Sequence, residues 1–314
     1  MFRYRQATTV ADLALHAAYA AAPRLRVLVT GASGLVGRAV VGALTTGGHT
    51  VVAVVRGEGP VRWSVEAGLL DDPGPVDAVV HLAGESLAQR WTPARKAEMR
   101  RSRVDGTRAL VASLRAFGRR PAVFLSASAV GWYDDLGDVP QDEDAPRAPA
   151  GFRADLVADW EAEAAQADAD RVVHLRLGVV VSPRGGMLQR VLPVFRLGLG
   201  GPVGSGRQYV PWIGLDDVVA LVVRILQEPG WQGPVNAVAP EAVTSRAFAR
   251  TLGRVLRRPA VLPAPAFALR LAFGEMADAL LLAGARVVPA RALAMGHGFR
   301  HPRLEDALRH GLGR

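Results

Sequence analysis

Two kinds of segment alternate along the chain from residue 25 onwards. Short, nearly continuous apolar runs occupy residues 27–30, 50–55, 77–83, 122–126 and 172–181. Between them lie stretches in which apolar residues recur at helical spacing, as in Val40, Val41 and Leu44. Strands of a parallel sheet that is covered on both faces have this continuous apolar character, and helices connect them. The pattern therefore predicts an α/β fold with a doubly wound parallel sheet.

The two ends of the chain differ from this pattern. Past residue 240, a helical stretch at 245–256 is followed by a proline-rich link and a second helical stretch at 266–273. These features predict a small C-terminal domain that is mainly helical. The segment before the first apolar run is expected to form an N-terminal arm. We therefore divide the chain into residues 1–23, 24–240 and 241–314.

The first apolar run leads into three glycines, Gly31, Gly34 and Gly37, and a helical pattern and a second strand follow. Such a turn needs glycine where φ is positive or where the backbone approaches a ligand closely. The N–H groups and the positive dipole end of the new helix suit a pyrophosphate. We expect a dinucleotide at this turn, held by Gly31, Ser33, Gly34, Leu35, Val36 and Gly37. The alternative is an ordinary glycine-rich turn of an α/β protein.

The end of the second strand indicates which dinucleotide is bound. The strand reads Val54-Val55-Arg56, and no carboxylate occurs before Glu58. An acidic residue there would bind the ribose hydroxyls of NAD, whereas an arginine would pair with the 2′-phosphate of NADP. Arg56 therefore predicts NADP(H). The alternative is a solvent-facing arginine at a strand end.

Composition excludes several classes of function. The chain of 314 residues has 38 Lys and Arg against 29 Asp and Glu, a net charge of +9, and no cysteine. Its single lysine is Lys96, and its arginines are spread without a basic block or a recognition motif, so we expect no nucleic-acid partner. The lack of cysteine excludes disulfides and thiolate catalysis. No apolar run has the length of a membrane span, and the cytoplasm is the expected location.

Several spaced motifs resemble a known superfamily. Thr30-Gly31-x-x-Gly34-x-x-Gly37, His81-Leu82-Ala83-Gly84 and Val104-Asp105-Gly106-Thr107 are similar to the extended short-chain dehydrogenases/reductases, which have a Rossmann fold. Within it, Gly84-Glu85-Ser86, Arg90-Trp91-Thr92, Ser126-Ala127-Ser128-Ala129-Val130-Gly131 and Leu197-Gly198-Leu199-Gly200-Gly201 resemble the epimerase-family, or nucleoside-diphosphate-sugar-epimerase-like, proteins. Residues 243–311 resemble the C-terminal domain of unknown function of that family. Residues 1–23 resemble a segment that follows an upstream domain in longer relatives.

The resemblance implies cofactor contacts beyond the glycine turn. It assigns them to Val55, Arg56, Leu82, Ala83, Gly84, Glu98, Arg103 and Val180. A cofactor with several negative charges needs a second arginine that faces the crevice, and Arg103 lies where its helix would do so. The alternative for Arg103 is a surface position one turn from Met99 or Thr107.

The usual catalytic pair of the superfamily is missing. Members that transfer hydride use Tyr-x-x-x-Lys, in which the lysine lowers the pKa of the tyrosine, together with a Ser or Thr. The residue four before Lys96 is Thr92, and the helix that should carry the pair has Arg153 and Val157 at the two positions. Any chemistry of this chain therefore needs another acid or base.

The remaining candidates are few. Ser128 matches the Ser/Thr position and could orient a substrate carbonyl; its alternative is a strand-end serine that bonds local backbone. Tyr133 is the phenol nearest to the expected crevice, and its alternative is a packing role. Arg207 could hold an anionic substrate and Trp212 could form its apolar wall, although packing explains Trp212 equally well. The seven histidines lack ligand spacing, so no metal site is predicted, and His81 is expected to be a hydrogen-bonded core residue.

Two functions are compatible with these residues. The first is an NADP(H)-dependent oxidoreductase or epimerase-like enzyme with a small-molecule substrate and an atypical acid. The alternative is a non-catalytic NADP(H)-dependent regulator or scaffold, linked to the cell-division label that some relatives carry. Neither the substrate nor the oligomeric state follows from the sequence.

Overall fold

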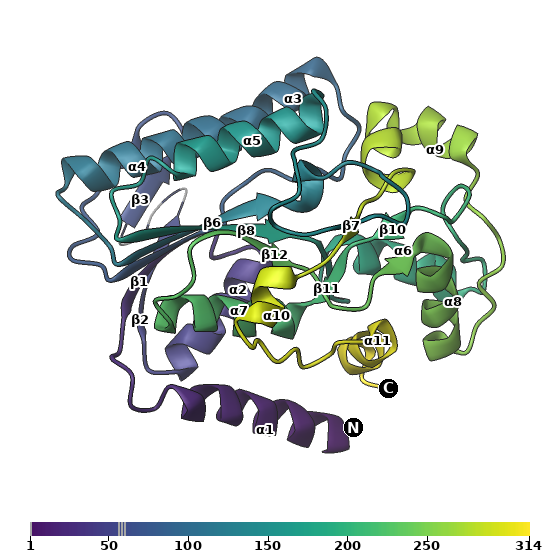
Figure 1. The fold of residues 1–314 in the computed structure, drawn as a ribbon, viewed down its shortest axis with the longest axis horizontal. Coiled ribbons are helices and arrows are strands. Elements are labelled where there is room, and N and C mark those ends of the chain that lie inside the picture. The colour runs from purple at the N-terminus through teal and green to yellow at the C-terminus, as the bar shows by residue number, and fades with distance from the viewer. Residues whose placement is uncertain (1, 56, 58, 60) are drawn as a thin grey trace.

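The computed structural model describes residues 2–55, 57, 59 and 61–314, so Arg56 lies outside the described residues. At its centre is an eight-stranded sheet in the order β12-β8-β6-β5-β1-β2-β3-β4 (Figure 1). The strands are β1 (Arg26–Thr30), β2 (Thr50–Val55), β3 (Val61–Ser64), β4 (Gly68–Leu69), β5 (Ala78–His81), β6 (Val123–Ala129), β8 (Arg171–Leu177) and β12 (Gly233–Ala237). All neighbours pair in parallel except β3 and β4. The predicted doubly wound parallel sheet is confirmed.

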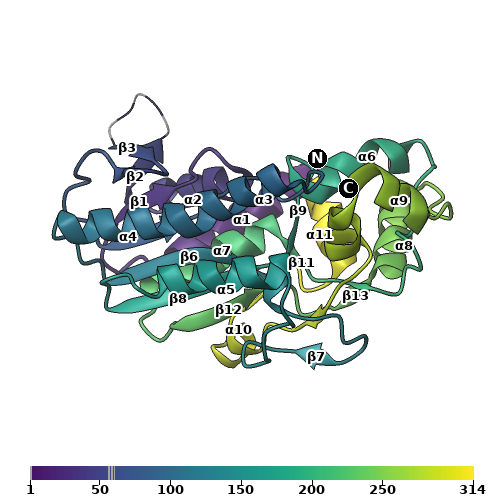
Figure 2. The same cartoon turned by 90° about the horizontal axis from the view of Figure 1, so that it is seen from above.

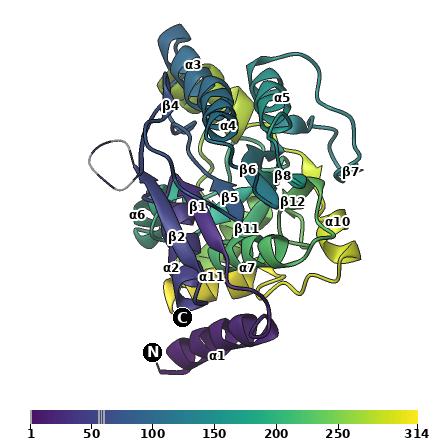
Figure 3. The same ribbon diagram turned by 90° about the vertical axis from the view of Figure 1, so that its left-hand side faces the viewer.

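Helices cover both faces of this sheet. In Figure 3, α3 (Pro93–Arg100), α4 (Gly106–Ala116) and α5 (Phe152–Ala164) lie above it, and α2 (Leu35–Thr46) and α7 (Leu215–Gln227) lie below it. Side chains of successive strand residues point to opposite faces. Val27 and Val29 of β1 therefore pack in the core with α2 and α7, whereas Leu28 packs in the core with α4. Burial on both faces explains the continuous apolar runs in the sequence.

The C-terminal helices gather at one end of the molecule (Figure 2). They are α8 (Ser245–Leu256), α9 (Ala266–Phe273) and α11 (Leu304–Leu312), and α6 (Gly186–Arg196) joins them from the preceding segment. Helix α10 (Ala290–Ala294) lies apart from them, beside β12. A core of its own holds α6, α8 and α11 together through residues such as Leu192, Leu252 and Leu308. The predicted mainly helical C-terminal region is therefore present.

Short strand pairs connect the helical end to the sheet. They are β9 (Val179–Val181) with β11 (Trp212–Gly214), β10 (Tyr209–Val210) with β13 (Val243–Thr244), and β7 (Pro140–Gln141) with β14 (Arg286–Val287). The last pair returns the chain to the sheet domain, where α10 contacts β12. The boundary at residue 240 therefore stays a prediction, because β14 and α10 pack on the sheet domain although they follow this boundary in the sequence.

The predicted N-terminal arm contains helix α1 (Phe2–Ala18), which lies beside α7 (Figure 1). Polar contacts attach this arm: the Tyr19 hydroxyl donates to Glu228 Oε1 at 2.6 Å, and Arg300 donates to Asp12 Oδ1 at 2.7 Å and to the carbonyl oxygen of Ala11 at 3.1 Å. Across the described ranges, no helix combines the length and the apolar character needed to cross a membrane.

Candidate functional site

The turn between β1 and α2 has no room for side chains at two of its three glycines. Gly31 has φ +67°, and a Cβ there would lie 2.7 Å from the carbonyl carbon of Leu82. A Cβ on Gly37 would lie 2.1 Å from the carbonyl oxygen of Gly31. Such distances are far below van der Waals contact, so residues 31 and 37 must be glycine for the turn to sit this close to the chain after β5.

A cavity of about 230 Å³ lies beside this turn. Its lining residues are Thr30, Gly31, Ala32, Ser33, Gly34, Val54, Val55, Trp63, Leu82, Ala83 and Gly84. Seven predicted cofactor residues are thereby brought together: Gly31, Ser33, Gly34, Val55, Leu82, Ala83 and Gly84. The N-terminus of α2, with Leu35, Val36 and Gly37 in its first turn, is adjacent. Four N-terminal N–H groups of a helix lack partners within the helix, so this end can bind an anion.

His81 contacts the strand that leads into the glycine turn. Its imidazole is completely buried, with Nδ1 2.7 Å from Thr30 Oγ1 and Nε2 2.9 Å from Thr107 Oγ1. Thr30 Oγ1 in turn accepts from the Ala83 N–H at 3.3 Å. Burial lowers the pKa of His81 to about 4, so the ring is neutral. The expected core histidine is present, and it also connects the strand before the glycine turn to α4.

Arg103 presents unsatisfied donors at the edge of the cavity. Its side chain is buried, and Nη2 donates to the carbonyl oxygen of Glu85 at 2.7 Å. Nε and Nη1 have no hydrogen-bond partner within the described part of the chain. A Cβ on Gly84 would lie 3.2 Å from Arg103 Cζ, so the guanidinium touches a residue that lines the cavity. Burial lowers the pKa of Arg103 to about 10, which still leaves it charged at neutral pH.

A buried guanidinium with two free nitrogens is costly unless an acceptor meets it. The glycine turn and Arg103 therefore fit the group that the sequence predicts, a dinucleotide with negative charge. Two other predicted contacts, Glu98 and Val180, do not line this cavity and stay predictions. Glu98 is partly exposed and accepts from Arg95 at 2.7 Å, and Val180 is in β9, paired with Ile213 of β11.

Ser128 and Tyr133 belong to one buried network. Ser128 donates to Glu161 Oε1, and Arg176 holds the same carboxylate with Nε and Nη2, each at 2.9 Å. Arg176 Nη1 also donates to the Tyr133 hydroxyl at 3.0 Å. That hydroxyl donates to Asn236 Oδ1 at 2.7 Å. The two predicted catalytic residues are thus joined through a bidentate ion pair, which is the strongest geometry for such a contact.

The environment of Tyr133 opposes ionisation. Its side chain is completely buried, and burial raises its pKa to about 12 despite the neighbouring Arg176. The superfamily's tyrosine works because its pKa is lowered, so Tyr133 has the opposite property. Arg176 and Glu161 were not predicted as site residues. The available signal was an arginine within the apolar run 172–181, since a buried charge requires a partner.

The two predicted substrate residues lie in different surroundings. Trp212 is buried among α8 and α11 and donates from Nε1 to the carbonyl oxygen of Glu241 at 2.8 Å. Arg207 is exposed in the segment before β10. Their roles toward a substrate stay predictions, and the contacts of Trp212 match the packing alternative.

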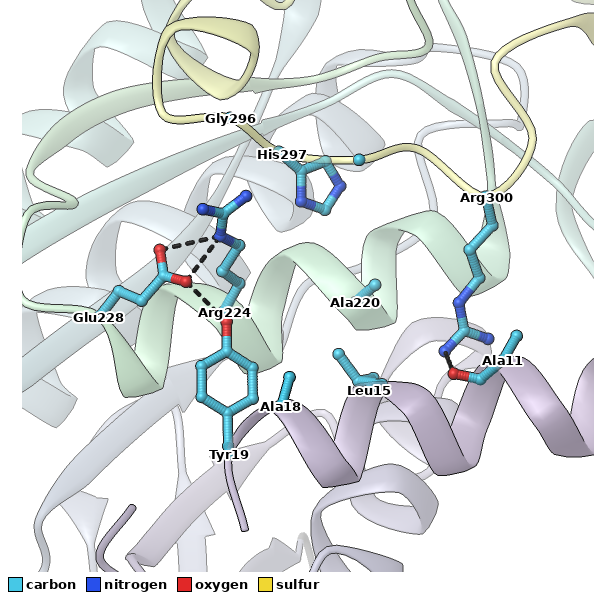
Figure 4. A pocket seen from close by; sticks show the side chains of 11 residues that line it. Ala11, Leu15, Ala18, Tyr19, Ala220, Arg224, Glu228, Gly296, His297 and Arg300 are labelled. Carbon is cyan, nitrogen blue, oxygen red and sulfur yellow. Dashed lines mark hydrogen bonds and ion pairs between the residues drawn. The ribbon is translucent and has the colours of Figure 1, made fainter. Parts of the chain in front are cut away.

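A larger cavity, of about 360 Å³, lies between α1, α7 and the loop after α10 (Figure 4). Arg224 and Glu228 face each other in it, with Nε 2.7 Å from Oε1, and the Tyr19 hydroxyl meets the same carboxylate. His297 points into the space between Arg224 and Arg300, and its Nε2 has no partner among the residues that the structure describes. None of the predicted cofactor residues lines this cavity.

Known families and proteins are similar to this chain over most of its length. Residues 27–237 match the model of the NAD dependent epimerase/dehydratase family, and residues 264–311 match a domain of unknown function, DUF1731. The epimerase family protein Mb2239 of Mycobacterium bovis is 42% identical over 291 residues, which cover 90% of this chain and 96% of that protein. The mouse epimerase family protein SDR39U1 is 39% identical over 295 residues, with 91% and 99% covered.

Two solved structures are similar over the whole fold. The crystal structure of human epimerase family protein SDR39U1 (isoform 2) with NADPH has a TM-score of 0.84 at 34% identity, and the match covers 92% of this chain and 99% of that one. The nucleoside-diphosphate sugar epimerase of Corynebacterium glutamicum has a TM-score of 0.81 at 34% identity. That match covers 100% of this chain and 64% of the other, which is a longer protein.

Proposed function

Because this chain belongs to the NAD-dependent epimerase/dehydratase family of short-chain dehydrogenases/reductases, we propose that it is an NADP(H)-dependent oxidoreductase or epimerase-like enzyme acting on a small molecule. The observation that carries the proposal is Arg103, whose Nε and Nη1 are buried without partners beside the glycine-lined cavity. The human relative that was crystallised with NADPH supports the choice of cofactor.

Three groups of residues would hold the cofactor. Gly31, Gly34 and Gly37 let the pyrophosphate approach the N-terminus of α2. Leu82, Ala83 and Gly84 form the opposite wall, and Arg103 adds positive charge there. Arg56 would meet the 2′-phosphate. When bound, the nicotinamide gives or takes a hydride.

Ser128 is our candidate for the polar group at the substrate. Its only proton is donated to Glu161, so the serine oxygen is left to accept a hydrogen bond. We assign it to a substrate hydroxyl rather than to a carbonyl: Ser128 Oγ would accept a hydrogen bond from that hydroxyl and orient it, while Ser128 continues to donate its own hydrogen bond to Glu161 Oε1. Tyr133 remains a candidate, although its contacts with Arg176 and Asn236 favour a positioning role.

A specific observation also favours a non-catalytic regulator. Arg153, at the usual tyrosine position, donates to the carbonyl oxygens of Ala279 and Tyr133, each at 3.0 Å. Val157, at the usual lysine position, is buried. Helix α5 thus uses the usual tyrosine position to bind the C-terminal region, and a cofactor site coupled to that contact could report the redox state to a partner.

Binding of NADPH to the Arg103→Met variant tests the cofactor site. We expect at least a tenfold loss of affinity, or ~1.4 kcal/mol, because two donors to the cofactor disappear. Arg100→Met is the matched control, since Arg100 is exposed and paired with Asp159. Equal affinity of both variants for NADPH would refute the proposed role of Arg103.

The Arg56→Asp variant separates NADP from NAD. We expect it to weaken NADPH far more than NADH, because only NADPH carries the 2′-phosphate. Equal losses would contradict the assignment.

Turnover separates the enzyme from the regulator. Purified protein with NADP(H) bound is assayed against panels of carbonyl, alcohol and sugar-nucleotide substrates. The enzyme predicts turnover that Ser128→Ala abolishes. The regulator predicts none on any panel, together with a partner whose binding differs between the NADP⁺ and NADPH forms.

A further inference from the structure

Three side chains able to bind a metal meet at the C-terminal helix. Asp216 is in the first turn of α7, His301 is in the loop before α11, and His310 is in α11 itself. One ligand atom from each lies within 4.8 Å of the other two. The imidazole rings of His301 and His310 have centroids 4.3 Å apart and are tilted by 35°, and His310 Nε2 is hydrogen-bonded to Asp216 Oδ2. In the chain as described, this is the one such cluster.

We propose that Asp216, His301 and His310 bind a divalent transition-metal ion, with zinc as the best fit. Imidazole nitrogen and carboxylate oxygen are preferred zinc ligands, and three protein ligands with a water is a common zinc arrangement. Mg²⁺ and Ca²⁺ take oxygen ligands, so two imidazoles disfavour them. All three side chains are partly exposed, so small rotations can bring the ligand atoms to zinc bond lengths of ~2.0–2.2 Å.

The surroundings hold the ligands in place. Asp217 accepts from the backbone N–H of Arg300 at 2.5 Å and of His301 at 3.2 Å, which fixes the loop against the start of α7. This anchoring keeps the loop that carries His301 close to Asp216. Arg300, whose positive charge would repel a metal cation, is turned toward α1, where its guanidinium bonds Asp12 Oδ1 and the carbonyl oxygen of Ala11.

The position of the site indicates what the metal would do. It would join α11 to α7 across a sequence separation of 94 residues. The same loop carries Arg300, the contact to α1, so a metal here would fasten the C-terminal segment and, through it, the N-terminal helix. The ion would stabilise this end of the fold, and none of its ligands lines the glycine-lined cavity.

Metal titration of the purified full chain tests the proposal. After treatment with a chelator, the protein is titrated with ZnCl₂ and with CoCl₂. We expect one equivalent to bind, the visible absorption of Co²⁺ in a low-symmetry site, and a higher Tm with zinc, because an ion that binds only the folded state stabilises it. Asp216→Asn, His301→Gln and His310→Gln should each weaken binding at least tenfold. His16→Gln, which alters a histidine on α1, should leave it unchanged.

A second measurement avoids the risk that a variant misfolds. In the wild-type protein, Co²⁺ should shift and broaden the NMR signals of the ring protons of two of the seven histidines. No binding by the wild type, binding that survives both histidine substitutions, or perturbation of other histidines would overturn the site.

Discussion

Ser128 of β6 and Arg176 of β8 lie opposite each other in the parallel sheet and share the carboxylate of Glu161. The register of two neighbouring strands thus places a hydroxyl and a guanidinium side by side at the carboxyl ends of the strands. Ligands of such sheets bind beyond these ends. Because Glu161 comes from α5, which covers the sheet, the contact also fixes the helix that carries Arg153.

The Glu161→Gln variant should be strongly destabilised. It leaves the buried Arg176 without a counter-charge, and breaking one partner of a buried ion pair costs ~3–5 kcal/mol. Urea unfolding followed by circular dichroism measures the change. The control is Arg120→Ala, which removes exposed ion pairs with Asp168 and Asp170 and should cost less than ~1 kcal/mol. Similar losses in the two variants would contradict the structural role of the buried pair.

Local signals explain which parts of the fold the sequence predicts. The apolar run 27–30 appears as β1 and the run 50–55 as β2, since both are continuous and bounded by polar residues or glycine. The run 172–181 is wrong as one strand: it divides at Gly178 into β8 and β9. A Cβ on Gly178 would lie 2.2 Å from the carbonyl oxygen of Pro211, so another segment closes on the chain there. Both halves are apolar, and the pattern cannot show the break.

The same distinction between local and long-range contacts decides which parts of the site the sequence predicts. The glycine turn is local, so its spacing predicts its structure. Arg176 bonds Glu161 and Tyr133, which are 15 and 43 positions away, and only the folded sheet brings them together. The metal-ligating cluster is longer in range still, which is why histidine spacing gave no hint of it.

Substitution of two glycines in α2 should have opposite effects. Gly37→Ala puts a methyl group 2.1 Å from the Gly31 carbonyl oxygen, so the turn must shift, at a cost of ~1–3 kcal/mol and with weaker NADPH binding. Gly42→Ala is in the same helix, is exposed and meets nothing within 4 Å, so it should stabilise by ~0.5–1 kcal/mol. Denaturant unfolding and cofactor titration of both variants check this. A stabilised Gly37→Ala would show that the close contact is not as described.

The Tyr133→Phe variant distinguishes positioning from catalysis. It removes a buried hydroxyl that bonds both Arg176 and Asn236, and we expect a loss of ~1–3 kcal/mol in stability. If the proposed turnover is found, a positioning role leaves the pH profile unchanged and lowers the rate only modestly. Abolished turnover in a variant of normal stability would instead make Tyr133 catalytic.

Stability should fall at acidic pH because of His81. Its pKa is lowered by burial from 6.5 to about 4, so the folded state favours the neutral ring. The resulting stabilisation is complete above the unfolded pKa of about 6.5 and is lost as the pH falls toward 4. At ~1.4 kcal/mol per pKa unit, His81 alone accounts for a loss of ~3 kcal/mol.

Other buried groups and the carboxylates add their own pH dependence, so the wild type must be compared with His81→Asn. Asparagine keeps a polar side chain between Thr30 and Thr107 without titrating. Unfolding free energies measured from pH 7 to pH 4 should therefore decline more steeply for the wild type, and parallel curves would show that His81 does not remain neutral in the folded protein.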